Sequence, residues 1–207
     1  MKYSKYFLIS LLVIFIDQAI KLLVHFNMEM GQNGQIKVFG DWFKIHYILN
    51  PGMAFGVKLD IVYGKLILTL IRIIATVAIA FYIKHLIDKK RHTGLLYCMC
   101  LILGGAIGNV VDSIFYGVFL GNAPLGSPTV WFNGQVIDMI FVDIWEGHLP
   151  KWIPYFGGGY YSFWPIFNIA DASIFVGVFI ILFRNETFFN YNKSPNIVEE
   201  GELKAEN

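Results

Sequence analysis

The sequence FNIAD at residues 167–171 opens an apolar run that reaches Phe183, so a carboxylate lies inside the start of a hydrophobic segment. A charged group within a membrane span is costly, which makes Asp171 a functional-site candidate by default. A second carboxylate, Asp138, lies on the other side of a long aromatic and glycine-rich stretch. If the two carboxylates face each other at the membrane surface, they form an acid–base pair around one water molecule.

The composition indicates an integral membrane protein. Apolar residues make up 56% of the chain and charged residues 15%, whereas soluble domains carry about 25% charged residues. The net charge is +1 and the chain has no Lys/Arg-rich tract, which argues against a nucleic-acid partner. The two cysteines, Cys98 and Cys100, lie in an apolar run and lack the spacing of common zinc motifs.

Four stretches hold the roughly 20 apolar residues that a membrane-spanning helix needs. They cover about residues 6–26, 66–87, 95–116 and 165–184. We therefore expect an all-α membrane protein with four transmembrane helices in residues 1–184. A polar and acidic tail over residues 185–207 is expected to be disordered.

Positive charges predict the orientation of these spans. The short connection 84–92 holds three lysines and one arginine, lysines precede the first span, and Arg184 follows the fourth. The positive-inside rule then places both termini in the cytoplasm. The lysines of the 27–65 loop weaken this bias without reversing it. All five tryptophans fall in the two segments placed outside, as expected for an interfacial aromatic belt.

The outer segments show weaker patterns. Residues 36–48 alternate between apolar and polar positions around Gly40-Asp41, which predicts a β-hairpin. Residues 117–135 are rich in Gly, Pro and Asn and are expected to form a loop, and residues 145–164 are expected to form an aromatic surface loop. The outer face should thus carry a small β-rich element.

The polar residues of the spans converge on one depth. With this topology and a helix rise of about 1.5 Å per residue, all of them fall in the outer third of the bilayer or just above it. They are Asp17, Lys21, Asn109, Asp112, Asn168 and Asp171, joined by Asp138 of the outer loop.

Structural roles are open alternatives for several of these residues. Asp17 and Lys21 stand at i, i+4, so they can neutralise each other and brace the bundle. Asn109 and Asp112 can link helices through hydrogen bonds. Asp143 competes with the other candidates for the role of second acid.

Other chemistries have less support in the sequence. The chain contains neither a His-Glu-x-x-His zinc motif nor a Gly-x-Ser-x-Gly nucleophile elbow. A carboxylate-rich metal site built from Asp138, Asp143, Glu146 and His148 is an alternative, although its spacing is unspecific. A proton-coupled transporter would place its acids near the bilayer midplane, often in repeated or broken helices. A structural scaffold would tolerate Asp→Asn at both acids.

Five motifs occur in order along the chain: Asp17-Gln18 with Lys21, NPGMAFG at 50–56, GGAIGNVVD at 104–112, VID at 136–138 and FNIAD at 167–171. This set resembles the lipoprotein signal peptidase (signal peptidase II) family of bacterial membrane aspartyl proteases. The resemblance implies that Asp138 and Asp171 are the catalytic pair. It further implies roles in substrate binding or site support for Asn50, Gly52, Asn109, Asp112, Asn168, Asp17 and Lys21.

The resemblance also implies a substrate and a location. The substrate is a prolipoprotein whose cysteine carries a diacylglyceryl group, cleaved just before that cysteine without a metal or organic cofactor. The enzyme is expected to be a monomer in the bacterial cytoplasmic (inner) membrane, in contact with membrane lipid, with its site at the extracytoplasmic face. One departure concerns Ser113, which stands where the family commonly has Arg. The outer connections 117–135 and 143–164 look long for the family.

Overall fold

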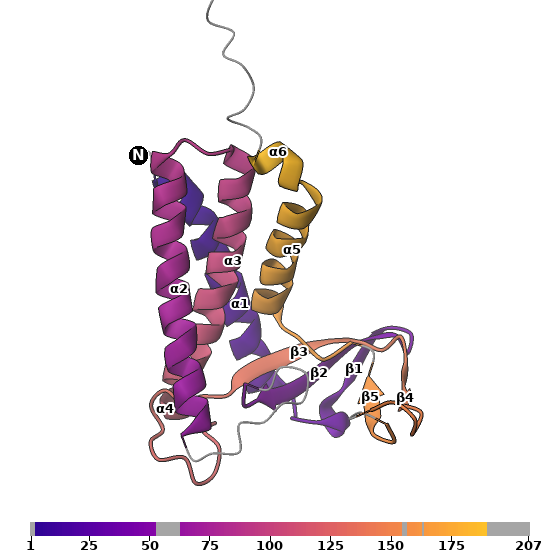
Figure 1. Ribbon diagram of the computed structural model, residues 1–207. Helices are drawn as coiled ribbons and strands as arrows, with labels where there is room; N and C mark the ends of the chain where they lie inside the picture. The colour runs from indigo at the N-terminus through magenta and orange to yellow at the C-terminus, as the bar shows by residue number, and fades with distance from the viewer. Residues whose placement is uncertain (1–2, 53–62, 155–156, 163, 190–207) are drawn as a thin grey trace, which may run out of the picture.

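The computed structural model describes residues 3–52, 63–154, 157–162 and 164–189. Three long apolar helices run side by side: α1 (Ser4–Asn27), α2 (Gly64–Asp88) and α3 (Thr93–Val111) (Figure 1). The last continues through a π-helical turn, η2 (Asp112–Tyr116), into the short α4 (Gly117–Phe119). Within the described ranges, these three helices are long and apolar enough to cross a membrane.

The expected fourth span is helical over a shorter range than predicted. Of the predicted 165–184 stretch, only Ile169–Phe183 forms a helix, α5, and its 15 residues fall short of the usual spanning length. The residues just before α5 pair with a strand instead. The Phe167 N–H donates to the Ile140 carbonyl at 3.0 Å, and the Ile140 N–H donates back to Phe167 at 2.7 Å.

The predicted disorder of the tail does not hold for its first residues. Asn185–Phe189 forms the short helix α6, and the Phe188 ring is buried against His92 at a centroid distance of 5.1 Å. Burial of this aromatic ring stabilises the turn. Residues 190–207 lie outside the described part of the chain.

Two small antiparallel sheets complete the described structure. The first has strand order β1-β2-β3, formed by β1 (Ile36–Phe39), β2 (Phe43–Asn50) and β3 (Val136–Val142). The predicted hairpin is the β1–β2 pair. The second sheet pairs β4 (Glu146–His148) with β5 (Tyr160–Ser162) inside the aromatic stretch. A single 3-10 turn, η1 (Gln32–Gly34), precedes β1.

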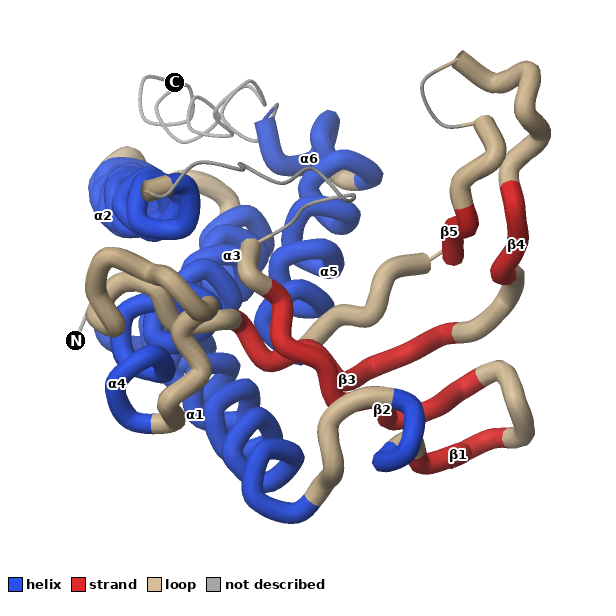
Figure 2. The backbone as a smooth tube through the Cα atoms, turned by 90° about the horizontal axis from the view of Figure 1, so that it is seen from below, coloured by secondary structure: helices blue, strands red, loops and turns tan. Residues whose placement is uncertain are grey.

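The central helix is α3, which packs against α1, α5 and α2. Gly104 permits its close approach to α1, since a Cβ there would come within 2.8 Å of the Val13 side chain. The three-stranded sheet lies at one end of the helix bundle, and β3 is the strand next to the helices (Figures 1 and 2). The N-terminus and α6 lie at the opposite end (Figure 1). We call the first of these the sheet end.

Candidate active site

Asp138 lies in the middle of β3 and is only 1% exposed. Its Oδ2 accepts a hydrogen bond from Asn50 Nδ2 at 2.9 Å, and its Oδ1 accepts one from Asn168 Nδ2 at 2.6 Å. Burial, followed by the nearby charge of Asp171, raises the pKa of Asp138 to about 7. The two amide donors act in the opposite direction, because they stabilise the ionised carboxylate.

Asp171 lies in the first turn of α5, where Asn168 is the N-cap residue. The Asn168 side chain accepts from the Asp171 N–H at 2.9 Å, and Asp171 Oδ2 accepts from the Asn168 N–H at 3.4 Å. This reciprocal capping box fixes the start of the helix. Asn109 Nδ2 donates to Asp171 Oδ1 at 2.8 Å. Asn168 therefore binds the carboxylate of Asp138 and the backbone of Asp171 at the same time.

A tight turn after β2 aims the Asn50 side chain. The Gly52 N–H donates to Asn50 Oδ1 at 2.8 Å, which directs the amide nitrogen toward Asp138. Gly52 has a φ of +101°, and a Cβ at this position would come within 2.3 Å of Leu68 on α2. Both constraints favour glycine. The rest of the motif, residues 53–56, lies outside the described ranges.

The spans contribute a buried ionic cluster. Lys21 is fully buried, and its Nζ lies 2.8 Å from Asp17 Oδ2, 2.8 Å from Asp112 Oδ2 and 3.1 Å from Asn109 Oδ1. Asp17 Oδ1 also accepts from the Ala170 N–H of α5 at 2.9 Å. The cluster thus joins α1, α3 and α5, and Asn109 extends it to Asp171. Every residue that the sequence nominated for the site is part of this connected set.

Sequence reasoning missed two members of the cluster. Gln18 Nε2 donates to Asp17 at 3.0 Å and to Asp112 at 2.8 Å, and its Oε1 accepts from the Tyr116 hydroxyl at 2.9 Å. The Asp17-Gln18 motif already contained the signal for Gln18. No signal in the sequence pattern singled out Tyr116.

A charged side chain of α2 was also missed. Arg72 Nη1 donates to Ser113 Oγ at 3.2 Å, and the guanidinium interacts electrostatically with Asp171, Asp138 and Asp112. The polar residues of the second span recur on one helical face, which is a signal that the sequence offered.

The rival second acid has a different partner. Asp143 lies at the end of the sheet, and Lys44 Nζ is 2.6 Å from its Oδ2. Glu146 and His148 are exposed in β4. Within the described part of the chain, no three His, Cys, Asp or Glu side chains are grouped so that they could hold a metal ion. The metal-site alternative therefore lacks a geometric basis there.

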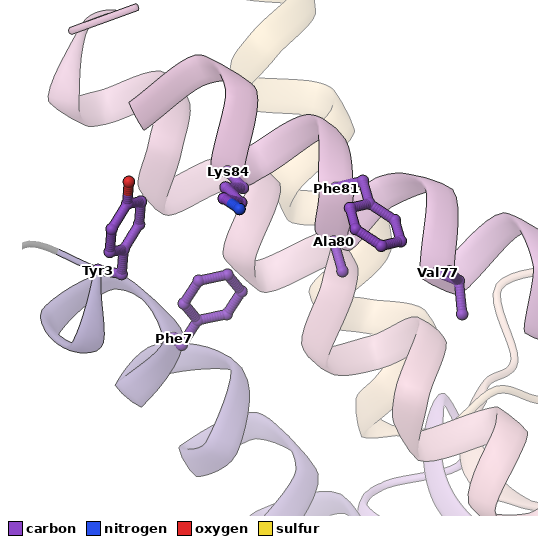
Figure 3. Close-up of a pocket in the computed structure, with 6 residues that line it drawn as sticks. All are labelled: Tyr3, Phe7, Val77, Ala80, Phe81 and Lys84. Carbon is purple, nitrogen blue, oxygen red and sulfur yellow. The ribbon is translucent and has the colours of Figure 1, made fainter. Parts of the chain in front are cut away.

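An apolar groove lies between the start of α1 and the second half of α2 (Figure 3). It is lined by Tyr3, Phe7, Val77, Ala80, Phe81 and Lys84. It contains no carboxylate and lies toward the end of the bundle opposite the sheet (Figures 1 and 3). The groove is therefore separate from the hydrogen-bonded acids, which lie at the sheet end.

The two acids have the properties of a general acid–base pair. One carboxyl group is deeply buried and has a pKa raised to about 7, while the second belongs to a capped helix start that the same asparagine holds. Two neighbouring carboxylates share a proton because both cannot ionise cheaply. Such a pair can activate a water molecule and protonate a leaving group.

Comparisons with known proteins agree with this chemistry. The family model of signal peptidase (SPase) II matches residues 9–186. The chain is 52% identical over 182 residues to the lipoprotein signal peptidase of Amoebophilus asiaticus, covering 87% of this chain and 77% of the relative. It is 40% identical over 182 residues to that of Porphyromonas gingivalis, covering 83% and 78%.

A solved structure shares the fold. It is a bacterial membrane enzyme determined by the in meso method at 1.9 Å resolution, with a TM-score of 0.60 and 26% sequence identity. The similarity covers 88% of this chain and 93% of that one.

Proposed function

Because the chain belongs to the signal peptidase II family, which cleaves signal peptides from prolipoproteins, we propose that Asp138 and Asp171 are its catalytic acids. The observation that carries this proposal is the shared Asn168, which donates to Asp138 at 2.6 Å and accepts from the Asp171 N–H at 2.9 Å. It brings into one hydrogen-bonded unit two acids that lie far apart in the sequence.

In the proposed mechanism the pair works with a single shared proton. The pKa of Asp138 of about 7 makes it the member that carries this proton for much of the time at neutral pH. The ionised member takes a proton from a bound water, which attacks the scissile carbonyl carbon. The protonated member donates a hydrogen bond to the carbonyl oxygen and then protonates the leaving amine. Amide donors from Asn50, Asn109 and Asn168 hold both carboxyl groups in position.

The proposed topology brings the substrate to this pair. We place the sheet end at the extracytoplasmic face of the bacterial inner membrane, with α5 as a fourth and shorter span and both termini in the cytoplasm. The acyl chains of a diacylglyceryl-cysteine then stay in the lipid, while the bond before the cysteine meets water at the surface. No metal or organic cofactor takes part, and a single copy of the chain carries the whole site.

The test is cleavage of a diacylglyceryl-modified prolipoprotein by the purified full chain in detergent. Asp138→Asn and Asp171→Asn should each lower the rate by more than about 100-fold, the range lost with a general acid or base. Asp143→Asn is the matched control, because this acid is paired with Lys44 outside the unit. A chelator should leave the wild-type rate unchanged. Cleavage by either dyad variant at the wild-type rate would refute the assignment.

A further inference from the structure

Helix α2 carries a polar stripe through an otherwise apolar segment. Lys65, Thr69, Arg72 and Thr76 follow one another at i, i+4, i+7 and i+11, so they lie on one face of the helix. The two threonines bond to their own helix: Thr69 Oγ1 donates to the Lys65 carbonyl at 2.9 Å and Thr76 Oγ1 to the Arg72 carbonyl at 2.7 Å. The two cations are therefore the members of the stripe whose side chains do not bond to their own helix.

Both cations have unused donors, and those of Lys65 are buried whereas Arg72 is half-buried. Lys65 Nζ is buried and has no hydrogen-bond partner among the described residues. Arg72 has one partner there, Ser113 Oγ, for the five N–H groups of its guanidinium. A buried donor without a partner is costly, which indicates that a ligand completes Lys65, and the spare donors of Arg72 on the same face are available to that ligand.

The cations border the acid pair. Arg72 interacts electrostatically with Asp171 and Asp138, and Lys65 interacts with Asp138. Lys65 Nζ also lies 3.5 Å from the position of a Cβ on Gly52, the glycine of the turn that aims Asn50. Arg72 also reaches α3 through its bond to Ser113, next to Asp112 in the sequence. The α2 face is thus the side of the site on which positive charge is concentrated.

Negative charge exceeds positive charge within the ionic cluster and the acid pair. Asp17, Asp112 and the singly protonated acid pair carry three negative charges, and Lys21 offsets one of them. Lys65 and Arg72 lie on the α2 side of these carboxylates. A group with strong acceptor atoms fits this face best.

Building on the proposed function, we propose that Arg72 and Lys65 bind carbonyl oxygens of the bound substrate. Guanidinium and ammonium groups only donate hydrogen bonds, so they match ligands that only accept. The substrate brings such acceptors to this depth: the peptide carbonyls before the modified cysteine and the ester carbonyls of its diacylglyceryl group. An extended peptide drawn into the bilayer also needs partners, because each unsatisfied backbone group there costs several kcal/mol.

The test uses Arg72→Gln and Arg72→Lys in the full chain. Gln can keep the bond to Ser113 but removes the charge and most donors, whereas Lys keeps the charge. We expect Arg72→Gln to raise KM for the diacylglyceryl prolipoprotein about tenfold, the loss of one charged hydrogen bond, with kcat within about twofold. Arg72→Lys should recover part of this loss, and Lys65→Met should also raise KM. Lys84→Ala, an exposed cation on the same helix, is the control.

A second substrate distinguishes the two sources of carbonyl oxygen. In an ether-linked dialkylglyceryl prolipoprotein the ester carbonyls are absent. If Arg72→Gln still raises KM for this substrate, Arg72 binds a peptide carbonyl. If the rise in KM disappears, Arg72 binds an ester carbonyl.

Three results would overturn the inference. If Arg72→Gln has the wild-type KM and kcat, Arg72 does not bind the substrate. A loss confined to kcat, with a shifted pH profile, makes Arg72 an electrostatic partner of the acids instead. A lower unfolding temperature with unchanged kinetics makes it structural. Failure of the wild type to cleave is a separate outcome, which refutes the proposed function and with it this inference.

Discussion

Replacing Asn168 with serine or with alanine separates the two roles of this side chain. Its Oδ1 caps α5 by accepting from the Asp171 N–H at 2.9 Å, and its Nδ2 donates to Asp138 at 2.6 Å. Serine still caps a helix but lacks the amide donor that reaches Asp138. Alanine lacks both functions. The capping term should therefore make Asn168→Ala about 1 kcal/mol less stable than Asn168→Ser.

The effect on the pKa of Asp138 should be the same in both variants, because both lack the amide donor. A hydrogen bond to a charged group is worth about 1.5–3 kcal/mol, which corresponds to about one to two pKa units. Because the Asn168 amide favours the ionised carboxylate, its loss raises the pKa of Asp138 further above its present value of about 7. The singly protonated pair then persists to higher pH. The alkaline limb of the kcat/KM profile should move upward by at least about one pH unit.

The assay is prolipoprotein cleavage between pH 5 and 10, with thermal unfolding recorded in the same detergent. Wild type, Asn168→Ser and Asn168→Ala are measured in parallel. An unmoved alkaline limb in the serine variant would show that the 2.6 Å contact does not tune Asp138. Equal unfolding temperatures of the two variants would show that the cap contributes nothing to stability.

Three further outcomes follow from the structure. Lys21→Met should destabilise the protein by about 3–5 kcal/mol in thermal unfolding, because it leaves two buried carboxylates unpaired; Lys37→Met, which breaks an exposed ion pair of the same i, i+4 spacing, should leave the unfolding temperature unchanged. Asp138→Asn should gain stability over wild type as pH rises from 5 to 8. The reason is that a carboxyl group with a pKa of about 7 in the fold and an ordinary value of 3.8 destabilises the fold by up to ~4 kcal/mol at high pH; a pH-independent difference would contradict this. Gly52→Ala should lower the cleavage rate at least about tenfold, because its Cβ would clash with α2 and displace the turn; Gly31→Ala, with a φ of +88° and open space around it, is the control.

The three long helices could be predicted closely from the sequence. The expected ranges 6–26 and 66–87 differ from Ser4–Asn27 and Gly64–Asp88 by at most two residues at each end. Hydropathy predicts these ends because a membrane-spanning helix is formed by one apolar run of about 20 residues, so the helix and the run begin and end together. The start of α5 depends instead on backbone pairing between Phe167 and Ile140, a nonlocal contact that hydropathy does not register. The capping box at Asn168 was the local signal that the helix begins there.

The candidate site could be predicted as a group but not in its connections. Helix rise and span direction place the polar residues at one depth, so their convergence follows from topology alone. Their pairing follows only in part: Lys21 pairs with Asp17, as the i, i+4 spacing allowed, but it lies equally close to Asp112 of α3, a contact that the spacing does not give. Arg72 was missed because hydropathy treats one cation in an apolar run as tolerated. Only the spacing of the polar residues on α2 distinguishes Arg72 in the sequence.

The ionic cluster is better explained by the acids that it positions than by stability. A buried salt bridge is weak evidence for stability, because a well-packed apolar replacement often stabilises a fold equally well. Here, however, the Asp17 carboxylate binds the Ala170 N–H in the first turn of α5, and Asp112 Oδ2 lies 3.4 Å from the Ile137 N–H on β3. These two backbone groups are each next to a candidate catalytic acid in the sequence. The backbone next to Asp138 and the backbone next to Asp171 are therefore both held by carboxylates that pair with Lys21. An apolar core could not provide these contacts.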